Sequence, residues 1–211
     1  PSCLPLSQGG QVLYLLVNEG EESLENALSL RSTGSLELWD PMDGSQRPWP
    51  ARLEEGRTHT HLRLERRQGL VLAVNPSGEP DPEVSLPPAA GEVIAEIPGP
   101  WKAMDVSGET IAVPCPGDWA QIREWEIFSG TLRFATEFER PGGSDPLFLD
   151  LGRVGNIAEV WLNGNSIGVL PWSPYVLEIS EACRPGANHL EVRVTNTMAN
   201  HYDGLQLPSG L

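Results

Sequence analysis

The chain has 211 residues, enough for one large β domain or two smaller ones, and its 39% hydrophobic and 20% charged residues are ordinary for a globular protein. Its formal net charge is -15, because 29 acidic residues face 14 basic ones. This balance argues against nucleic acid and against an anionic membrane surface as partners, since both need a basic face. It suits neutral partners such as carbohydrate, and a simple role in solubility also accounts for it.

The first block of predicted structure runs from Gln11 to Asn75. Strands are expected where apolar residues alternate or cluster, in "QVLYLLVN", "NALSLR", "SLELWD", "HTHLRLE" and "GLVLAVN". Asp-Gly at the centre of Asp40–Pro48 predicts a hairpin or short loop. A turn of helix is expected in two places only, Glu21–Ala27 and Ile179–Cys183. The block as a whole predicts a small antiparallel sandwich.

The segment 76–91, "PSGEPDPEVSLPPAAG", is rich in proline and small residues and has few large apolar side chains. This composition is typical of a linker. It predicts a small β-sandwich domain at residues 1–75 and a second domain at residues 92–211.

The second block contains strand patterns separated by Gly and Pro turns. They are "EVIAEI", "GTLRFATEFE", "PLFLDLG", "EVWLNGNSIGVL", "YVLEIS" and "NHLEVRVTN". In the second pattern apolar and polar residues alternate cleanly, as in a strand with one buried face. Strands at this spacing predict a sandwich or jelly roll, so the fold class expected for the chain is all-β.

Asn163-Gly164 predicts a hairpin, because both central residues of a type I′ turn need positive φ. Val160 and Leu162 should then face the core, and Trp161 should point the other way. Something must cover this ring: the other domain, a strand partner, a catalytic domain or a sugar. A domain contact is favoured over a ligand.

The three cysteines, Cys3, Cys115 and Cys183, are too few and too uneven for a disulfide framework, although one bridge stays open. No Cys-x-x-Cys spacing suggests zinc, and His59 and His61 lack a third ligand at fixed spacing. No apolar run reaches membrane-spanning length, and no signal peptide is visible. Because the chain starts with Pro1, we expect it to be trimmed from a longer protein.

Four motifs of the second block, in this order, resemble a known domain family: "FSGTLRFATEF" (Phe128–Phe138), "LFLDLGRVGNIAEVWLNGNSIGVL" (Leu147–Leu170), "PYVLEIS" (Pro174–Ser180) and "RPGANHLEVRVTN" (Arg184–Asn196). Together they resemble the galactose-binding-like β-sandwich of glycoside hydrolases. This jelly roll is the sugar-binding domain of family 2 enzymes. It is also similar to the C-terminal region of large bacterial α-L-rhamnosidase-like proteins of glycoside hydrolase family 106.

Three further motifs strengthen the comparison with family 106: "LELWDP" (Leu36–Pro41), "IPGPW" (Ile97–Trp101) and "NHYDGLQLPSGL" (Asn200–Leu211). The resemblance implies that catalysis belongs to a separate (β/α)-barrel, and no part of this sequence resembles one. It implies a C-terminal piece of a larger hydrolase, an adjoining catalytic domain as partner, and a secreted or periplasmic bacterial location. No cofactor is expected, although structural calcium is compatible with sugar-binding sandwiches.

No catalytic motif is recognisable in the sequence. Glycoside hydrolysis needs two carboxylates flanking one bond, but Asp150 and Glu159 are better explained as residues on solvated strand faces. There is no Gly-x-Ser-x-Gly motif and no glycine-rich phosphate loop. We therefore assign no catalytic residue.

Aromatic residues give the most useful signal, because sugar rings pack their C–H faces on aromatic side chains while directed polar groups bind the hydroxyls. The chain has seven Trp beside four Phe and three Tyr. Two clusters in turn-rich segments are candidates for carbohydrate binding. The first is Trp119, Arg123, Glu124 and Trp125; the second is Trp172, Tyr175, His201, Tyr202 and Asp203. Core packing or a domain contact is the competing interpretation for every Trp, and it is favoured most strongly for Trp39, Trp49 and Trp101.

The sequence thus predicts a non-catalytic module that binds carbohydrate or supports an adjoining catalytic domain of a glycoside hydrolase acting on plant or microbial polysaccharide. Two alternatives stay open. One is a glycosidase, α-L-rhamnosidase-like, with a shallow site at the sandwich rim. The other is an immunoglobulin-like interaction module without a sugar ligand.

Overall fold

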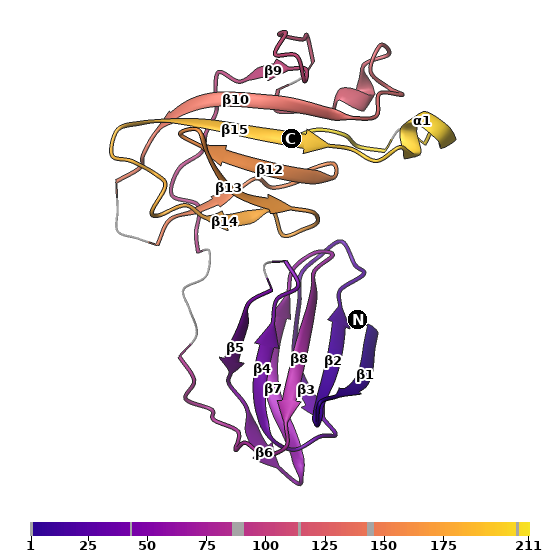
Figure 1. Cartoon of the computed structure of the whole chain (residues 1–211), viewed down its shortest axis with the longest axis vertical. Helices are drawn as coiled ribbons and strands as arrows, with labels where there is room; N and C mark the ends of the chain where they lie inside the picture. The colour runs from indigo at the N-terminus through magenta and orange to yellow at the C-terminus, as the bar shows by residue number, and fades with distance from the viewer. Residues whose placement is uncertain (1, 43, 86–90, 114, 143–145, 206) are drawn as a thin grey trace. The chain divides into compact units, whose positions relative to one another are not determined.

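The computed structural model describes residues 2–42, 44–85, 91–113, 115–142, 146–205 and 207–211, with the backbone alone described at 2–5, 7 and 8. The chain forms two compact units, Pro1–Pro88 (unit 1) and Ala89–Leu211 (unit 2). Both consist of antiparallel sheets (Figure 1), so the predicted all-β sandwich class is confirmed. No helix in the described part of the chain has the length and hydropathy of a membrane span.

The described residues of unit 1 form eight strands in two antiparallel sheets. The five-stranded sheet has the order β1 (Ser2–Gln8), β2 (Gln11–Val17), β8 (Gly69–Asn75), β4 (Ser35–Trp39) and β5 (Gln46–Trp49). The three-stranded sheet has the order β3 (Leu24–Leu30), β7 (Arg57–Leu64) and β6 (Arg52–Glu54). Alternate apolar residues of both sheets, among them Leu38, Leu62 and Leu72, are buried in one hydrophobic core, as expected for a sandwich.

The helical turn expected at Glu21–Ala27 is wrong, because this stretch is the end of a loop and the beginning of β3. Leu24 pairs with Leu64, and Leu30 pairs with Thr58. This pairing buries one side of β3 against the core, and burial outweighs the weak local helix preference. The sequence also gave no signal for β1.

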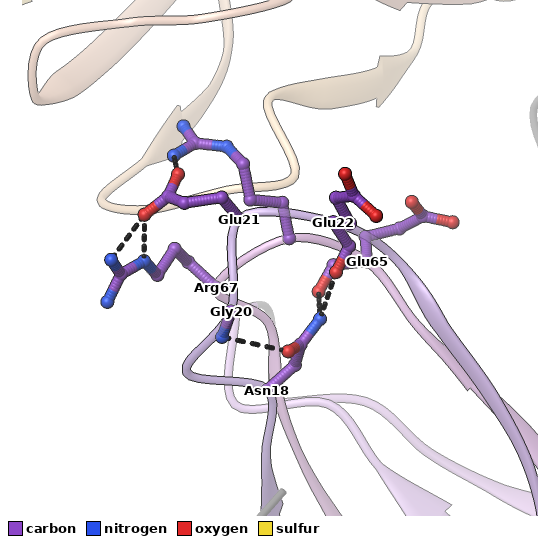
Figure 2. A network of polar contacts seen from close by, with 7 residues as sticks. Asn18, Gly20, Glu21, Glu22, Glu65 and Arg67 are labelled. Carbon is purple, nitrogen blue, oxygen red and sulfur yellow. Dashed lines mark hydrogen bonds and ion pairs between the residues drawn. The ribbon is translucent and has the colours of Figure 1, made fainter.

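The loop between β2 and β3 is fixed by side chains rather than by helical hydrogen bonds (Figure 2). Asn18, 1% exposed, donates from Nδ2 to Glu22 O at 2.7 Å and to Glu65 O at 2.9 Å. Its Oδ1 accepts from Gly20 N at 3.0 Å. The buried amide therefore ties this loop to the turn between β7 and β8.

The predicted hairpin at Asp40–Pro48 joins β4 to β5, with Asp40 N donating to Ser45 O at 2.9 Å. Asp43, half of the Asp-Gly signal, lies outside the described residues. The first part of the predicted linker is attached to unit 1, because Gly78 O accepts from Ser35 N and Asp81 O accepts from Ala51 N, both at 3.0 Å. The predicted domain bounds stay a prediction, which proteolysis tests.

Unit 2 is built on a five-stranded antiparallel sheet. Its order is β13 (Asn165–Leu170), β12 (Ile157–Leu162), β15 (Ala187–Thr195), β10 (Thr131–Glu139) and β9 (Lys102–Met104). A pair of short strands, β11 (Phe148–Asp150) and β14 (Val176–Glu178), contacts it through β13 (Figure 1). The described part of the unit also has two short helices, the 3-10 helix η1 (Trp119–Gln121) and α1 (Ala199–Asp203).

The inner face of this sheet follows the alternation of the sequence. Phe134, Val160 and Val192 are each 0% exposed and lie opposite one another on β10, β12 and β15. Thr136, on the same face of β10, donates its hydroxyl to Pro100 O at 2.9 Å, which satisfies a buried polar group. The core of unit 2 therefore lies beneath β10, β15 and β12.

The hairpin between β12 and β13 has the predicted turn. Asn163 and Gly164 both have positive φ, 54° and 82°, as a type I′ turn requires. The Asn163 side chain also donates to Ala182 O at 3.0 Å and to Asn188 Oδ1 at 2.8 Å. These bonds fix the hairpin to the body of the unit.

Trp161 points away from the core, as predicted, and is half-buried. Its cover is a side chain of the neighbouring strand: the Arg193 guanidinium lies 4.5 Å from the ring centroid, within cation–π range. Arg193 is in turn held by Glu191, at 2.8 Å, and by Glu159, at 3.5 Å. A strand partner, one of the four alternatives, therefore covers the ring.

Candidate functional site

Both predicted aromatic clusters lie at one end of unit 2, where β10 begins and β15 ends. We call it the loop end; its described residues are 105–113, 115–130, 171–175, 196–205 and 207–211. Figure 1 shows α1 beyond the end of β15, and β9 pairs with the first residues of β10 through Arg133 and Met104. The sheet order β9–β10–β15 therefore brings together segments that are about 70 to 100 residues apart in sequence.

Ser209 connects the two clusters and is 2% exposed. Its backbone N donates to Asp118 Oδ1 at 2.8 Å, and its carbonyl accepts from Trp119 N at 2.8 Å. Asn200 of α1 donates to its hydroxyl at 3.2 Å. The tail after α1 is thus a packed part of the loop end.

The loop end contains an open groove of about 650 Å³. Its walls come from the turn after β9, the loop after η1 and the beginning of β10. The lining residues are Asp105, Val106, Glu124, Trp125, Phe128, Ser129, Gly130 and Thr131. The groove therefore combines aromatic and aliphatic surface with two carboxylates, the combination that sugar sites use.

The aromatic side of the groove is built by consecutive turns. Trp125 N donates to Ile122 O at 2.8 Å, and Phe128 N donates to Trp125 O at 3.0 Å. The Trp125 and Phe128 rings meet edge to face, with centroids 5.0 Å apart and an interplanar angle of 69°. This contact fixes the half-buried Trp125 ring, so that a ligand would meet a preformed surface.

Asp105 stands in a tight turn at the other side of the groove. Its Oδ1 accepts from Ser107 N at 2.9 Å, from Ser107 Oγ at 2.7 Å and from Glu109 N at 2.9 Å. The hydrogen bond from the Ser107 hydroxyl is the main cause that holds the pKa of Asp105 below its usual range. None of these three bonds uses Oδ2, so this oxygen can accept a hydrogen bond from a ligand hydroxyl.

Two of the predicted binding residues are buried, and the exposed position expected for them is wrong. Trp119 is 0% exposed and stacks on Phe134 with centroids 6.0 Å apart. Tyr175 is 5% exposed and donates its hydroxyl to Asn156 O. Neither offers a free ring face to a sugar, because tertiary packing places each ring in the core.

The remaining predicted residues are on the surface, but only part of the first cluster lines the groove. Trp125 and Glu124 do so, whereas exposed Arg123, Trp172, His201, Tyr202 and Asp203 are not among its lining residues. Sequence reasoning missed Asp105, Val106 and Phe128. The motif Asp105-Val-Ser-Gly108 signals a turn, but it carries no sign of what the turn faces.

The described residues give little support for a metal site or for a reactive cysteine. No group of three or more His, Cys, Asp or Glu side chains among them could hold a metal ion. Cys115 and Cys183 are free, and the Cys3 side chain lies outside the described residues. Burial raises the pKa of the Cys115 thiol to about 11, so at neutral pH this group is not the thiolate that nucleophilic chemistry needs.

No family model matches the chain. The structure of a rhamnosidase from Novosphingobium sp. PP1Y is similar to 99% of it, with a TM-score of 0.76 and 27% identity, and the matched part is 23% of that chain. A putative beta-glucuronidase of Formosa agariphila is 29% identical over 160 residues, 58% of this chain and 14% of that protein. A β-glucuronidase structure from Ruminococcus gnavus matches 46% of the chain at 20% identity with a TM-score of 0.40, too slight a likeness to argue from.

The chain is related to glycoside hydrolases. The match to the rhamnosidase includes both units, so the predicted resemblance is confirmed at the level of a glycoside hydrolase-related β-sandwich. The chain spans less than a quarter of the rhamnosidase and a seventh of the glucuronidase.

Proposed function

We propose that this chain is a non-catalytic module of a glycoside hydrolase and that unit 2 binds carbohydrate in the groove beside Trp125. The observation that carries the proposal is the groove itself, with Trp125 on one side and Asp105 on the other. Stacking of a sugar ring on the indole and hydrogen bonds from its hydroxyls to the carboxylates would use both.

The second unit is proposed to be a galactose-binding-like jelly roll, and the pair of sandwiches to support an adjoining catalytic domain. The similarity of 99% of the chain to part of a rhamnosidase supports this reading. Work on extracellular polysaccharide would place the protein outside the cytoplasm of a bacterium, in the periplasm or the medium.

The test is binding of the whole chain to a glycan array, followed by NMR titration of each hit. A single shallow groove offers little contact area, so we expect dissociation constants on the order of micromolar to millimolar. Trp125→Ala should weaken binding about five- to tenfold, since loss of a stacked ring costs about 1–1.4 kcal/mol. Trp172→Ala is the matched control, because Trp172 is 40% exposed and lies outside the groove lining.

Three outcomes would contradict the proposal. Binding that survives Trp125→Ala would mean that the site lies elsewhere. Hydrolysis of aryl glycosides, abolished by Asp105→Asn or Glu124→Gln, would favour the glycosidase alternative, for which two carboxylates in one groove are the relevant feature. Absence of any glycan binding would favour an interaction module without a sugar ligand.

A further inference from the structure

The charges of the groove bear on the class of sugar that fits it. Asp105 and Glu124 line the groove, and no Lys, Arg or His stands among the described residues that line it. A ligand carboxylate placed there would meet two like charges, with no cationic side chain in this described lining. Such an arrangement discriminates between ligands by repulsion as well as by attraction.

The negative charge at Asp105 is fixed by geometry. Three hydrogen bonds, from Ser107 N, Ser107 Oγ and Glu109 N, converge on one carboxylate oxygen. Hydrogen bonds of this kind stabilise the charged form of a carboxyl group, and the pKa of Asp105 is lowered accordingly. The hydrogen-bonded turn therefore favours the charged form of Asp105 on this side of the groove.

The hydroxyls at the beginning of β10 are already engaged. Ser129 donates its hydroxyl to Thr197 O at 3.1 Å, and the Thr131 hydroxyl is 2.7 Å from the Thr195 hydroxyl. In contrast, Asp105 Oδ2 takes part in none of the three bonds to that side chain. The side of the groove formed by the β9 turn is thus an acceptor, suited to the donor hydroxyls of a neutral sugar.

We infer that the groove selects neutral sugars and rejects uronic acids, with Asp105 and Glu124 as the residues that determine this specificity. The inference rests on the proposed function and deepens it. The inferred preference differs from the one that the name of the putative beta-glucuronidase suggests, because glucuronic acid is an acidic sugar. The net charge of -15 of the whole chain also repels acidic oligosaccharides.

The experiment compares acidic oligosaccharides with their own carboxyl-reduced forms, which keep every linkage and replace the carboxylate by a neutral hydroxymethyl group. Oligosaccharides of polygalacturonate, alginate and glucuronan serve as probes, beside neutral oligosaccharides of rhamnose, galactose, glucose, mannose and xylose. At low salt, we expect each carboxyl-reduced form that binds to do so at least about tenfold more tightly than its acidic parent, because each like-charge contact costs about 1 kcal/mol in water. The difference should shrink at high ionic strength.

The double variant Asp105→Asn/Glu124→Gln should narrow the tenfold difference to less than about threefold. Asparagine keeps the acceptor oxygen that the turn needs, so the variant should fold. The matched control is Asp150→Asn/Glu181→Gln, which removes the same charge from two exposed residues of unit 2 outside the groove. Asparagine again keeps the acceptor oxygen, which here binds Gly152 N, and the control should leave the difference unchanged.

The outcomes separate the two claims. Equal or tighter binding of the acidic parents, or a difference that the double variant does not change, would overturn the selectivity while leaving the groove a sugar site. Failure of every neutral and acidic probe to bind would overturn the proposed function and the selectivity with it. Binding of the reduced forms that Trp125→Ala leaves intact would overturn the location of the site.

Discussion

The side-chain amide of Asn196 links the end of β15 to the segment before β10 and to the C-terminal tail. Its Oδ1 accepts from Gly130 N at 2.9 Å, and its Nδ2 donates to Phe128 O at 2.8 Å and to Ser209 Oγ at 3.1 Å. Phe128 and Gly130 line the groove, so this buried amide positions the groove without contacting a ligand.

We expect Asn196→Ala to lower the free energy of unfolding by about 2–3 kcal/mol, because three bonds are lost and buried partners are left unsatisfied. Glycan binding should weaken with it. Urea unfolding followed by circular dichroism measures the first effect, and NMR titration measures the second. Asn165→Ala, at an exposed position of β13, is the control; equal effects of both changes would contradict the role of Asn196.

Glu191 is a buried acid on the outer face of the unit 2 sheet, 8% exposed. It accepts from Arg133 at 2.5 Å and from Arg193 at 2.8 Å, and thereby holds Arg193 over Trp161. Burial acts to raise its pKa, but the hydrogen bonds from the two arginines outweigh burial, and the pKa lies below the ordinary value.

A carboxyl group whose pKa is lowered by folding stabilises the protein above its unfolded pKa, here 4.5, and this contribution is lost as the pH falls through the folded value. We expect Glu191→Gln to cost about 1–3 kcal/mol at pH 7, and the cost should shrink as the pH falls below 4.5. Urea unfolding between pH 3 and 8 measures it. Glu137→Gln, exposed on the same strand face as Arg133, should show a much smaller change, and a Glu191 effect that is independent of pH would contradict the assignment.

At the scale of elements, the β2–β3 loop is attached to the β7–β8 turn by the exposed Glu21 carboxylate. The Glu21 carboxylate accepts hydrogen bonds from the guanidinium groups of Arg66, at 2.6 Å, and Arg67 (Figure 2). The hydrogen bond from Arg67, followed by that from Arg66, lowers its pKa. The buried Asn18 makes the other connection between the two loops.

Glu21→Gln should therefore speed amide hydrogen exchange in residues 18–23 while leaving the global stability of unit 1 nearly unchanged, because exposed ion pairs contribute little to stability. Exchange measured by mass spectrometry resolves this segment. Glu19→Gln, at an exposed neighbour with no such pair among the described residues, should leave exchange unchanged. A large fall in the unfolding midpoint with Glu21→Gln would show that the pair does more than hold the loop.

At the scale of the whole molecule, the two units should separate under limited proteolysis. Because Gly78 and Asp81 are bonded to unit 1, we expect the first cuts between residues 82 and 92. Elastase can cut at Ala89 and Ala90, and a glutamate-specific protease at Glu83 and Glu92. Mass spectrometry of the fragments identifies the cut, and early cleavage inside Leu147–Leu170 would contradict the division.

The sequence by itself determined the features that depend on near neighbours. Alternation in β10 settled which residues face the core, since successive side chains of a strand point to opposite faces. Asn163-Gly164 determined the hairpin turn, because positive φ is a property of those residues. The same alternation in β12 placed Trp161 on the face opposite to Val160 and Leu162, and therefore away from the core.

Tertiary structure alone decided which loops meet and which aromatic rings are buried. Trp119 and Trp125 lie close together in the segment between β9 and β10. Nevertheless, Trp119 packs on Phe134 in the core, whereas Trp125 lines the groove. Asp105 reaches the same groove only because β9 pairs with β10. Such placement depends on the order of strands in the sheet, and this order arises from contacts between residues far apart in the chain, which no local pattern of the sequence records.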